Sequence, residues 1–262
     1  MKRYAKLYRA FVVNCVSRTI EFRAQFVAGL FGYAVWAGVS LVFIGVVFRD
    51  VEAVRGWTRD EMWVLYGTFV ILESLCYGII GPNMWRFSPM VRDGTLDLAL
   101  TKPVNTQFMV SARYIDPNGV INCLPGIALL FYGLNQLNLA PNFLNWLLWF
   151  GLLGCGFVMA YSLWFFCVTW SIWAVKLDSV AVVFDPMMQM ARFPIDLYPR
   201  RWASFLTFVL PIAFLTTFPT QALLGQLDPK VLLMAPLLSS LSLWACSRFF
   251  RFALRSYGSA SS

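Results

Sequence analysis

The run from Ala24 to Phe48 contains 25 consecutive residues without a charged side chain. As an α-helix it is about 37 Å long, which exceeds the roughly 30 Å hydrocarbon core of a bilayer. The whole chain of 262 residues is 59% hydrophobic and 13% charged, whereas soluble domains are about 25% charged. These proportions predict an all-α integral membrane protein and exclude a disordered chain, a collagen and a disulfide scaffold.

Seven stretches of the chain are apolar enough to be candidate membrane spans. Residues 1–23 carry six basic side chains and one acid, and the C-terminal tail carries three arginines and no acid. Because Lys and Arg concentrate on the cytoplasmic side, both termini are expected in the cytoplasm. Two cytoplasmic termini require an even number of crossings, so one stretch does not cross. The seven stretches are 24–48, 62–80, 119–139, 143–174, 179–191, 202–227 and 231–247.

The stretch 202–227 is the one we expect not to cross, because Pro211 and Pro219 divide it into pieces too short to span. The irregular residues 193–201 precede it, so we predict an outer re-entrant helical region over 193–227. A single Pro-kinked spanning helix is the alternative. The prediction gives a six-span transmembrane domain over 24–262, with 14 of the 21 basic residues on the cytoplasmic side.

Residues 1–23 have the pattern of an amphipathic helix rather than of a cleaved signal peptide. Apolar side chains recur with helical spacing on one side of this segment, and basic side chains occupy most of the other. We therefore expect a helix that lies in the cytoplasmic interface, with membrane lipid as a partner. A solvated basic segment with no docking role is the alternative.

The composition excludes several kinds of chemistry. Histidine is absent, which removes His-based triads and His metal ligands. The six cysteines form no C-x-x-C pair, so neither a disulfide nor a metal site is expected. No catalytic residue and no nucleic-acid partner is predicted, since the net charge of +8 is explained by membrane orientation. The acids Glu73 and Asp185 fall inside predicted spans, where each either lines a translocation pathway or is hydrogen-bonded to a neighbouring helix.

The largest polar interruption is the cytoplasmic segment 82–118, in which Asp93-Gly94 is a turn signal. In an extended conformation Leu96, Leu98 and Leu100 face one way, whereas Thr95 or Asp97 can instead begin a short helix. A compact element with an apolar edge predicts docking to a partner. An ordinary connecting loop is the alternative.

Two motifs in this order resemble the permeases of type-2 ATP-binding-cassette (ABC) transporters, in the branch with separately encoded six-span permeases. The run from Arg92 to Val104 is similar to their cytoplasmic loop, and the residues from Phe193 to Gly225 are similar to their outer re-entrant region. The resemblance implies ATPase coupling through a short helix; its residues here are Arg92, Asp93, Gly94, Leu96 and Leu98. It implies an outer gate in the re-entrant region, at Phe193, Pro194, Tyr198, Pro199, Pro211 and Pro219.

The resemblance further implies a bacterial-type cytoplasmic (inner) membrane exporter for an apolar, amphipathic or lipid-linked substrate. None of the 17 glycines precedes a lysine, so the chain has no P-loop and is expected to be no enzyme itself. ATP and Mg would be bound by a separate ABC ATPase subunit. A second permease copy or a paralogue, as homodimer or heterodimer, would complete the pathway. The alternatives are an ion-coupled secondary transporter that uses Glu73 or Asp185 and, less favoured, an intramembrane enzyme.

Overall fold

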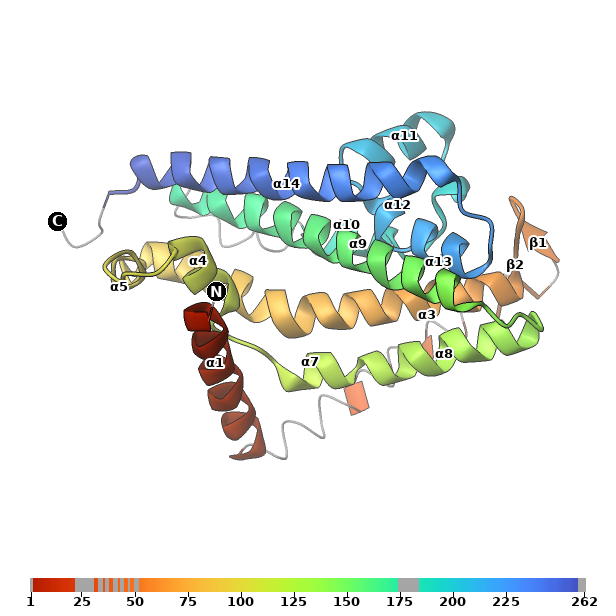
Figure 1. Cartoon of the computed structure of the whole chain (residues 1–262), viewed down its shortest axis with the longest axis horizontal. Coiled ribbons are helices and arrows are strands. Elements are labelled where there is room, and N and C mark those ends of the chain that lie inside the picture. Colours follow the sequence, from red (N-terminus) through yellow and green to blue (C-terminus); the bar gives the residue numbers. More distant parts are fainter. Residues whose placement is uncertain are drawn as a thin grey trace.

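The structure is a computed structural model of the whole chain, and it is mostly helical. It describes residues 2–21, 31–32, 35, 38–39, 42, 45–46, 48–49, 52–173 and 184–258, with the backbone alone at 2 and 18–21. α1 (Lys2–Glu21), the short helix α5 (Asp97–Leu100) and the C-terminal end of α14 (Pro229–Arg255) lie at one end of the molecule. The hairpin of β1 (Ala53–Val54) and β2 (Trp57–Thr58) lies at the other end (Figure 1).

The central element is a continuous helix over 59–92. It consists of α3 (Arg59–Leu75), a π-helical turn (Cys76–Ile80) and α4 (Gly81–Arg92). Thr58 begins it with a capping box, in which the Glu61 carboxylate accepts from the Thr58 amide at 2.8 Å. The helix thus continues beyond Ile80, the predicted end of the second span. Pro82, at the second position of α4, has no N–H group to donate to the preceding turn of this continuous helix.

Four helical stretches among the described residues are long and apolar enough to cross a membrane. They are Arg59–Arg92, Pro117–Gln136, Phe143–Ile172 and Pro229–Arg255. They correspond to the predicted spans 62–80, 119–139, 143–174 and 231–247. Most of the predicted span 24–48 lies outside the described residues, as does 179–183 of the span 179–191. The number of crossings stays a prediction.

The other elements include the long helices α8 and α9, and the rest are helices of at most nine residues and two 3₁₀ turns. They are α6 (Thr106–Ala112), α7 (Pro117–Ile121), α8 (Cys123–Gln136), α9 (Phe143–Thr169), a 3₁₀ turn (Trp170–Ile172), α10 (Phe184–Met190), a second 3₁₀ turn (Ile195–Leu197), α11 (Arg200–Phe208), α12 (Ile212–Leu215) and α13 (Thr217–Leu223). The expected break of 202–227 at Pro211 is present, since α12 begins directly after it. The second break falls at Thr216, and Pro219 lies within α13.

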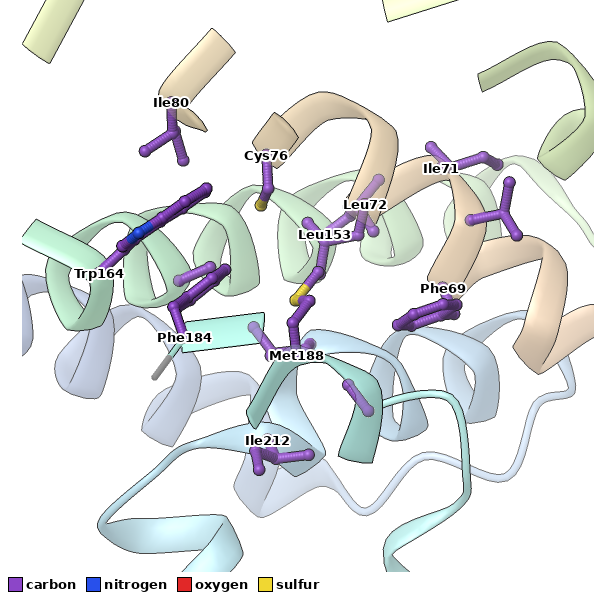
Figure 2. Packing of buried hydrophobic residues seen from close by; sticks show 14 of the residues in the cluster. Phe69, Ile71, Leu72, Cys76, Ile80, Leu153, Trp164, Phe184, Met188 and Ile212 are labelled. Atoms are coloured by element: carbon purple, nitrogen blue, oxygen red, sulfur yellow. The ribbon is translucent and has the colours of Figure 1, made fainter. Parts of the chain in front are cut away.

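The core is built on the helix 59–92, whose side chains from Met62 to Ser74 are all buried. α3 packs on α8, and α9 packs on α14 and on the short helices α12 and α13 (Figure 1). The approach of α3 to α8 requires glycine, because a Cβ at Gly67 would lie 2.6 Å from the Leu130 nitrogen. Figure 2 shows α10 on the same core, with Phe184 beside Trp164 and Met188 one turn further along.

Candidate functional site

The first candidate site is the turn that follows α4, where the resemblance places ATPase coupling. The Asp93 amide donates to the Pro89 carbonyl at 2.9 Å, and the Leu96 amide donates to the Met90 carbonyl at 3.1 Å. These bonds fold the chain back at Gly94, whose φ of +69° favours glycine. The polar segment is thereby held as a compact element at the end of the long helix.

Within this element Leu96 and Leu98 have opposite environments. Leu96 is fully buried, whereas Leu98 is 66% exposed. The extended alternative, with these two residues on one face, was wrong, because the backbone is helical from Asp97. Residues two apart in a helix lie on different faces. Leu96 therefore anchors the element, and Leu98 faces outward.

Two opposite charges lie at the end of α4, before this element folds back. The Arg92 guanidinium lies 3.3 Å from the Asp93 carboxylate, and both side chains are about half exposed. An exposed pair of this kind contributes little to stability, at most about 1 kcal/mol. Its charges are available to a partner.

The C-terminal end of α14 packs behind the same element. The rings of Phe87 and Phe250 contact each other with centroids 6.1 Å apart. Burial and the neighbouring Asp97 carboxylate both raise the pKa of Tyr257 above the usual value for tyrosine. The last residues of the described chain therefore lie against α5.

A second set of contacts fixes the chain where it returns from this element to the bundle. Asn83 is buried, and its amide pairs with both backbone polar groups of Tyr114. The Asp116 amide donates to the Gly78 carbonyl at 2.8 Å. In a π-helical turn the carbonyl of residue i accepts from residue i+5 instead of i+4. The regular α-helical hydrogen bonds are therefore interrupted at the place where the returning chain contacts the helix.

The N-terminal helix is attached to this returning segment through its apolar side. The ring of Tyr4 contacts that of Phe108 edge to face at 5.1 Å, and the Asn105 amide donates to the Tyr4 hydroxyl at 3.3 Å. Near the other end of α1, the Ile115 amide donates to the Cys15 sulfur at 3.4 Å. The basic side chains Arg3, Lys6 and Arg9 are exposed.

The two acids of the predicted spans lie on facing helices and are both hydrogen-bonded. Glu73 is 5% exposed, and its Oε1 accepts from the Gln189 amide at 2.8 Å. Asp185 Oδ1 accepts from the Tyr77 hydroxyl at 2.7 Å. Sequence reasoning found the two acids but neither partner, because uncharged Gln189 and Tyr77 give no hydropathy signal that sets them apart.

The predicted outer gate residues fall on two segments that the structure brings together. The Thr216 hydroxyl donates to the Ala191 carbonyl at 2.5 Å, and the Ile195 amide donates to the Thr217 hydroxyl at 3.1 Å. Sequence reasoning missed both threonines. Of the gate candidates, Pro194 and Pro219 are buried, Phe193, Tyr198 and Pro211 are half-buried, and Pro199 is exposed.

The β-hairpin closes over the first of these segments. Arg55 Nη1 donates to the carbonyls of Asp196 and Tyr198 at 3.2 and 3.3 Å, and Trp57 Nε1 donates to the Asp196 carboxylate at 3.0 Å. The Tyr198 hydroxyl donates to the Met190 carbonyl, and burial raises the pKa of Tyr198. The hairpin and the segment after α10 therefore form one hydrogen-bonded unit at this end of the molecule.

No metal centre is present within the part of the chain that the structure describes, where no three His, Cys, Asp or Glu side chains form a cluster. The cysteines described there are free thiols. A bundle of long apolar helices with buried polar links is typical of a multi-pass membrane protein.

The comparisons with known proteins give the family. The model of the ABC-2 family transporter protein matches residues 34–261, so this chain belongs to that family. It is a multi-pass permease of an ABC transporter, a membrane component and not itself the ATPase. No curated protein and no solved structure matches the chain.

Proposed function

We propose that the chain is the permease subunit of an ABC exporter in a bacterial-type cytoplasmic membrane. A separate ABC ATPase subunit binds ATP and Mg and closes on nucleotide, and the element from Arg92 to Leu98 receives that movement. The observation that carries the proposal is the position of this element. It ends the continuous helix 59–92, so a push at the exposed Leu98 is applied to the central helix of the bundle.

Rigidity along this route supports the proposal. Leu96 is buried, Asn83 ties the returning chain to α4, and Phe250 of α14 packs on Phe87 of α4. A partner that contacts this element therefore acts on a unit packed as one body rather than on a loose loop.

The described polar groups support the proposed class of substrate. The acids Glu73 and Asp185 are occupied by hydrogen bonds, and the surrounding core is aromatic and aliphatic. Such surroundings suit export of an apolar, amphipathic or lipid-linked molecule. The outer re-entrant region 193–227 would open last, with both termini in the cytoplasm, and a second copy or a paralogue would supply the other half of the pathway.

A second candidate function rests on the burial of Glu73. An acid at 5% exposure inside a span is a candidate proton carrier, so an ion-coupled secondary transporter is the competing class. The two functions differ in their energy source.

The deciding experiment is purification of the tagged chain in mild detergent with its co-expressed neighbours. A stoichiometric P-loop ATPase that hydrolyses ATP in the reconstituted complex supports the exporter. A preparation with no ATPase, whose transport follows an imposed proton gradient, overturns it in favour of the secondary transporter.

A further inference from the structure

Two hydrogen bonds cross from the helix 59–92 to α10, and they have the same spacing on both helices. Glu73 pairs with Gln189, and Tyr77 pairs with Asp185. The partners are four residues apart on each side and run in opposite order, so the helices are antiparallel at this contact. Four residues are about one helical turn, so a slide of α10 by one turn brings Gln189 opposite Tyr77.

The unused acceptor on Gln189 fits such a slide. Among the described residues nothing donates to Gln189 Oε1, although this atom is buried. A buried acceptor without a partner is unfavourable. One turn along, the Tyr77 hydroxyl would be the donor that this oxygen lacks.

The apolar side of α10 repeats the same spacing. Phe184 stacks on Trp164 with ring centroids 4.3 Å apart, and Met188 follows one turn later (Figure 2). After the slide Met188 would replace Phe184 against the indole, and a thioether packs well on an aromatic ring. The flexible side chains of Met187 and Met190 also adapt to a changed surface more easily than branched residues do.

Tyr77 is the fixed member of this contact. Its ring lies stacked on Trp85 at 5.9 Å and edge to face with Trp164 at 5.5 Å. The hydroxyl therefore moves with the long helix, and α10 exchanges partners. A slide in the opposite direction would place Asp185 opposite Glu73, and two facing carboxylates repel each other.

We propose that Tyr77 and Glu73 are positioning residues that hold α10 in one of two registers, and that the transport cycle moves α10 by one helical turn. In the present register Tyr77 bonds to Asp185; in the shifted register it bonds to Gln189. One-turn movements of packed elements are an established kind of switching. The inference rests on the proposed function, because the ATPase would supply the movement through the coupling end of the same helix.

Cross-linking of the intact permease–ATPase complex tests the two registers. The six native cysteines are replaced, and one chain receives Glu73→Cys with Gln189→Cys and another Tyr77→Cys with Gln189→Cys. A short bifunctional methanethiosulfonate is applied without nucleotide and after trapping with ADP and vanadate. We expect the 73–189 product to fall and the 77–189 product to rise on trapping, because a one-turn slide moves position 189 away from position 73 and opposite position 77. Unchanged yields of both products overturn the exchange.

A pair of single substitutions gives a second measurement that does not depend on the cysteine chains. Asp185→Ala removes the acceptor that only the present register uses, whereas Asp185→Asn keeps an acceptor oxygen and loses the same charge. We expect the ATP hydrolysis rate of the complex to change by about threefold with Ala and to stay near the unsubstituted rate with Asn. Equal rates for Ala and Asn contradict the register role.

The outcomes also separate this inference from the proposed function. A complex that hydrolyses ATP but keeps one cross-linking pattern refutes the register exchange alone. A chain that copurifies with no ATPase refutes the proposed function and the exchange with it.

Discussion

The side-chain amide of Asn83 pairs with both backbone polar groups of Tyr114. Its Nδ2 donates to the Tyr114 carbonyl at 2.7 Å, and its Oδ1 accepts from the Tyr114 amide at 2.9 Å. Asn83 is 1% exposed, so water does not compete for these groups. The link joins the helix 59–92 to the chain that returns from the proposed coupling element, Arg92 to Leu98, 31 residues after Asn83.

Replacing this amide should therefore cost stability. Asn83→Ala leaves the amide and the carbonyl of Tyr114 without partners, and each buried unpaired group costs about 1–3 kcal/mol. Asn83→Asp keeps an acceptor for the amide alone, so we expect its melting temperature to lie between those of the Ala variant and the unsubstituted chain. Thermal unfolding in detergent measures this order. Equal melting of all three chains would show that the pairing contributes nothing.

The contact between Gly78 and Gly119 gives a second prediction. A Cβ at Gly119 would lie 2.4 Å from the Gly78 Cα and 2.6 Å from its nitrogen, so Gly119→Ala forces the π-helical turn and α7 apart. Overpacking costs about 1–3 kcal/mol even where side chains can yield, and backbone atoms yield less. We expect a clear loss of thermal stability.

Gly151→Ala is the matched control, because a Cβ there meets nothing within 4 Å. On the exposed side of α9 the alanine should leave the free energy of unfolding unchanged or raise it by up to about 1 kcal/mol. Similar melting temperatures for the two variants would contradict the close approach at Gly119.

The spans, but not their contacts, could be predicted from the sequence. Apolar runs gave four of the helices because hydropathy reports which residues avoid water. The break at Pro211 was predictable because proline removes a donor from the helix. The π-helical turn gave no such signal, and the Asp116 amide that bonds to its Gly78 carbonyl comes from a distant part of the chain.

The candidate site was predictable in a similar, limited way. Asp93-Gly94 indicated a turn, and the positive φ of Gly94 agrees with it. The burial of Leu96 and the exposure of Leu98 could not be assigned, because both leucines have the same hydropathy and only tertiary packing decides which one is covered. The bond from Tyr77 to Asp185 spans 108 positions, and no local pattern specifies it.

The two leucines of the coupling element provide a paired prediction. Leu98→Glu changes an exposed side chain, so the permease should fold normally but retain much less ATPase during purification. Leu96→Ala removes a fully buried side chain and should lower the free energy of unfolding by about 2–5 kcal/mol. Melting temperature and copurified ATPase, measured on both variants, distinguish the two effects. Normal ATPase retention by Leu98→Glu would exclude this leucine from the partner contact.

A pH titration tests whether the C-terminal end lies on the coupling element. Burial and the Asp97 carboxylate raise the pKa of Tyr257, so the folded state favours the neutral phenol. The resulting stabilisation is present below the ordinary tyrosine pKa near 10 and is lost as pH rises through the raised value. The phenolate absorbance of the unsubstituted chain, minus that of Tyr257→Phe, reports this group.

Asp97→Asn is the control for that titration. It removes the charge while keeping the shape, so the pKa of Tyr257 should fall toward the ordinary value, with the part due to burial remaining. An unchanged Tyr257 titration would show that the two side chains are not neighbours.

The charges of Arg92 and Asp93 test the coupling itself. They form an exposed pair at 3.3 Å, so Arg92→Asp or Asp93→Arg should change stability by at most about 1 kcal/mol. At a partner surface, however, a reversed charge meets a like charge and weakens the contact. We expect each single reversal to leave membrane insertion intact while the permease no longer responds to ATP.

The response can be read at the opposite end of the molecule, where Pro199 is exposed. In a chain with Pro199→Cys as the only cysteine, a membrane-impermeant maleimide should label faster or slower when the ATPase is trapped with ADP and vanadate. Arg92→Asp should remove that nucleotide dependence while the ATPase still hydrolyses ATP, because the movement is no longer passed through the helix 59–92.

The double exchange, Arg92→Asp with Asp93→Arg, restores the pair with the two charges in swapped positions. If the partner contacts each charge separately, the double variant stays uncoupled. If only the presence of the ion pair matters, the double variant recovers the nucleotide-dependent labelling. A single reversal that keeps the full labelling response would remove the coupling role from this element.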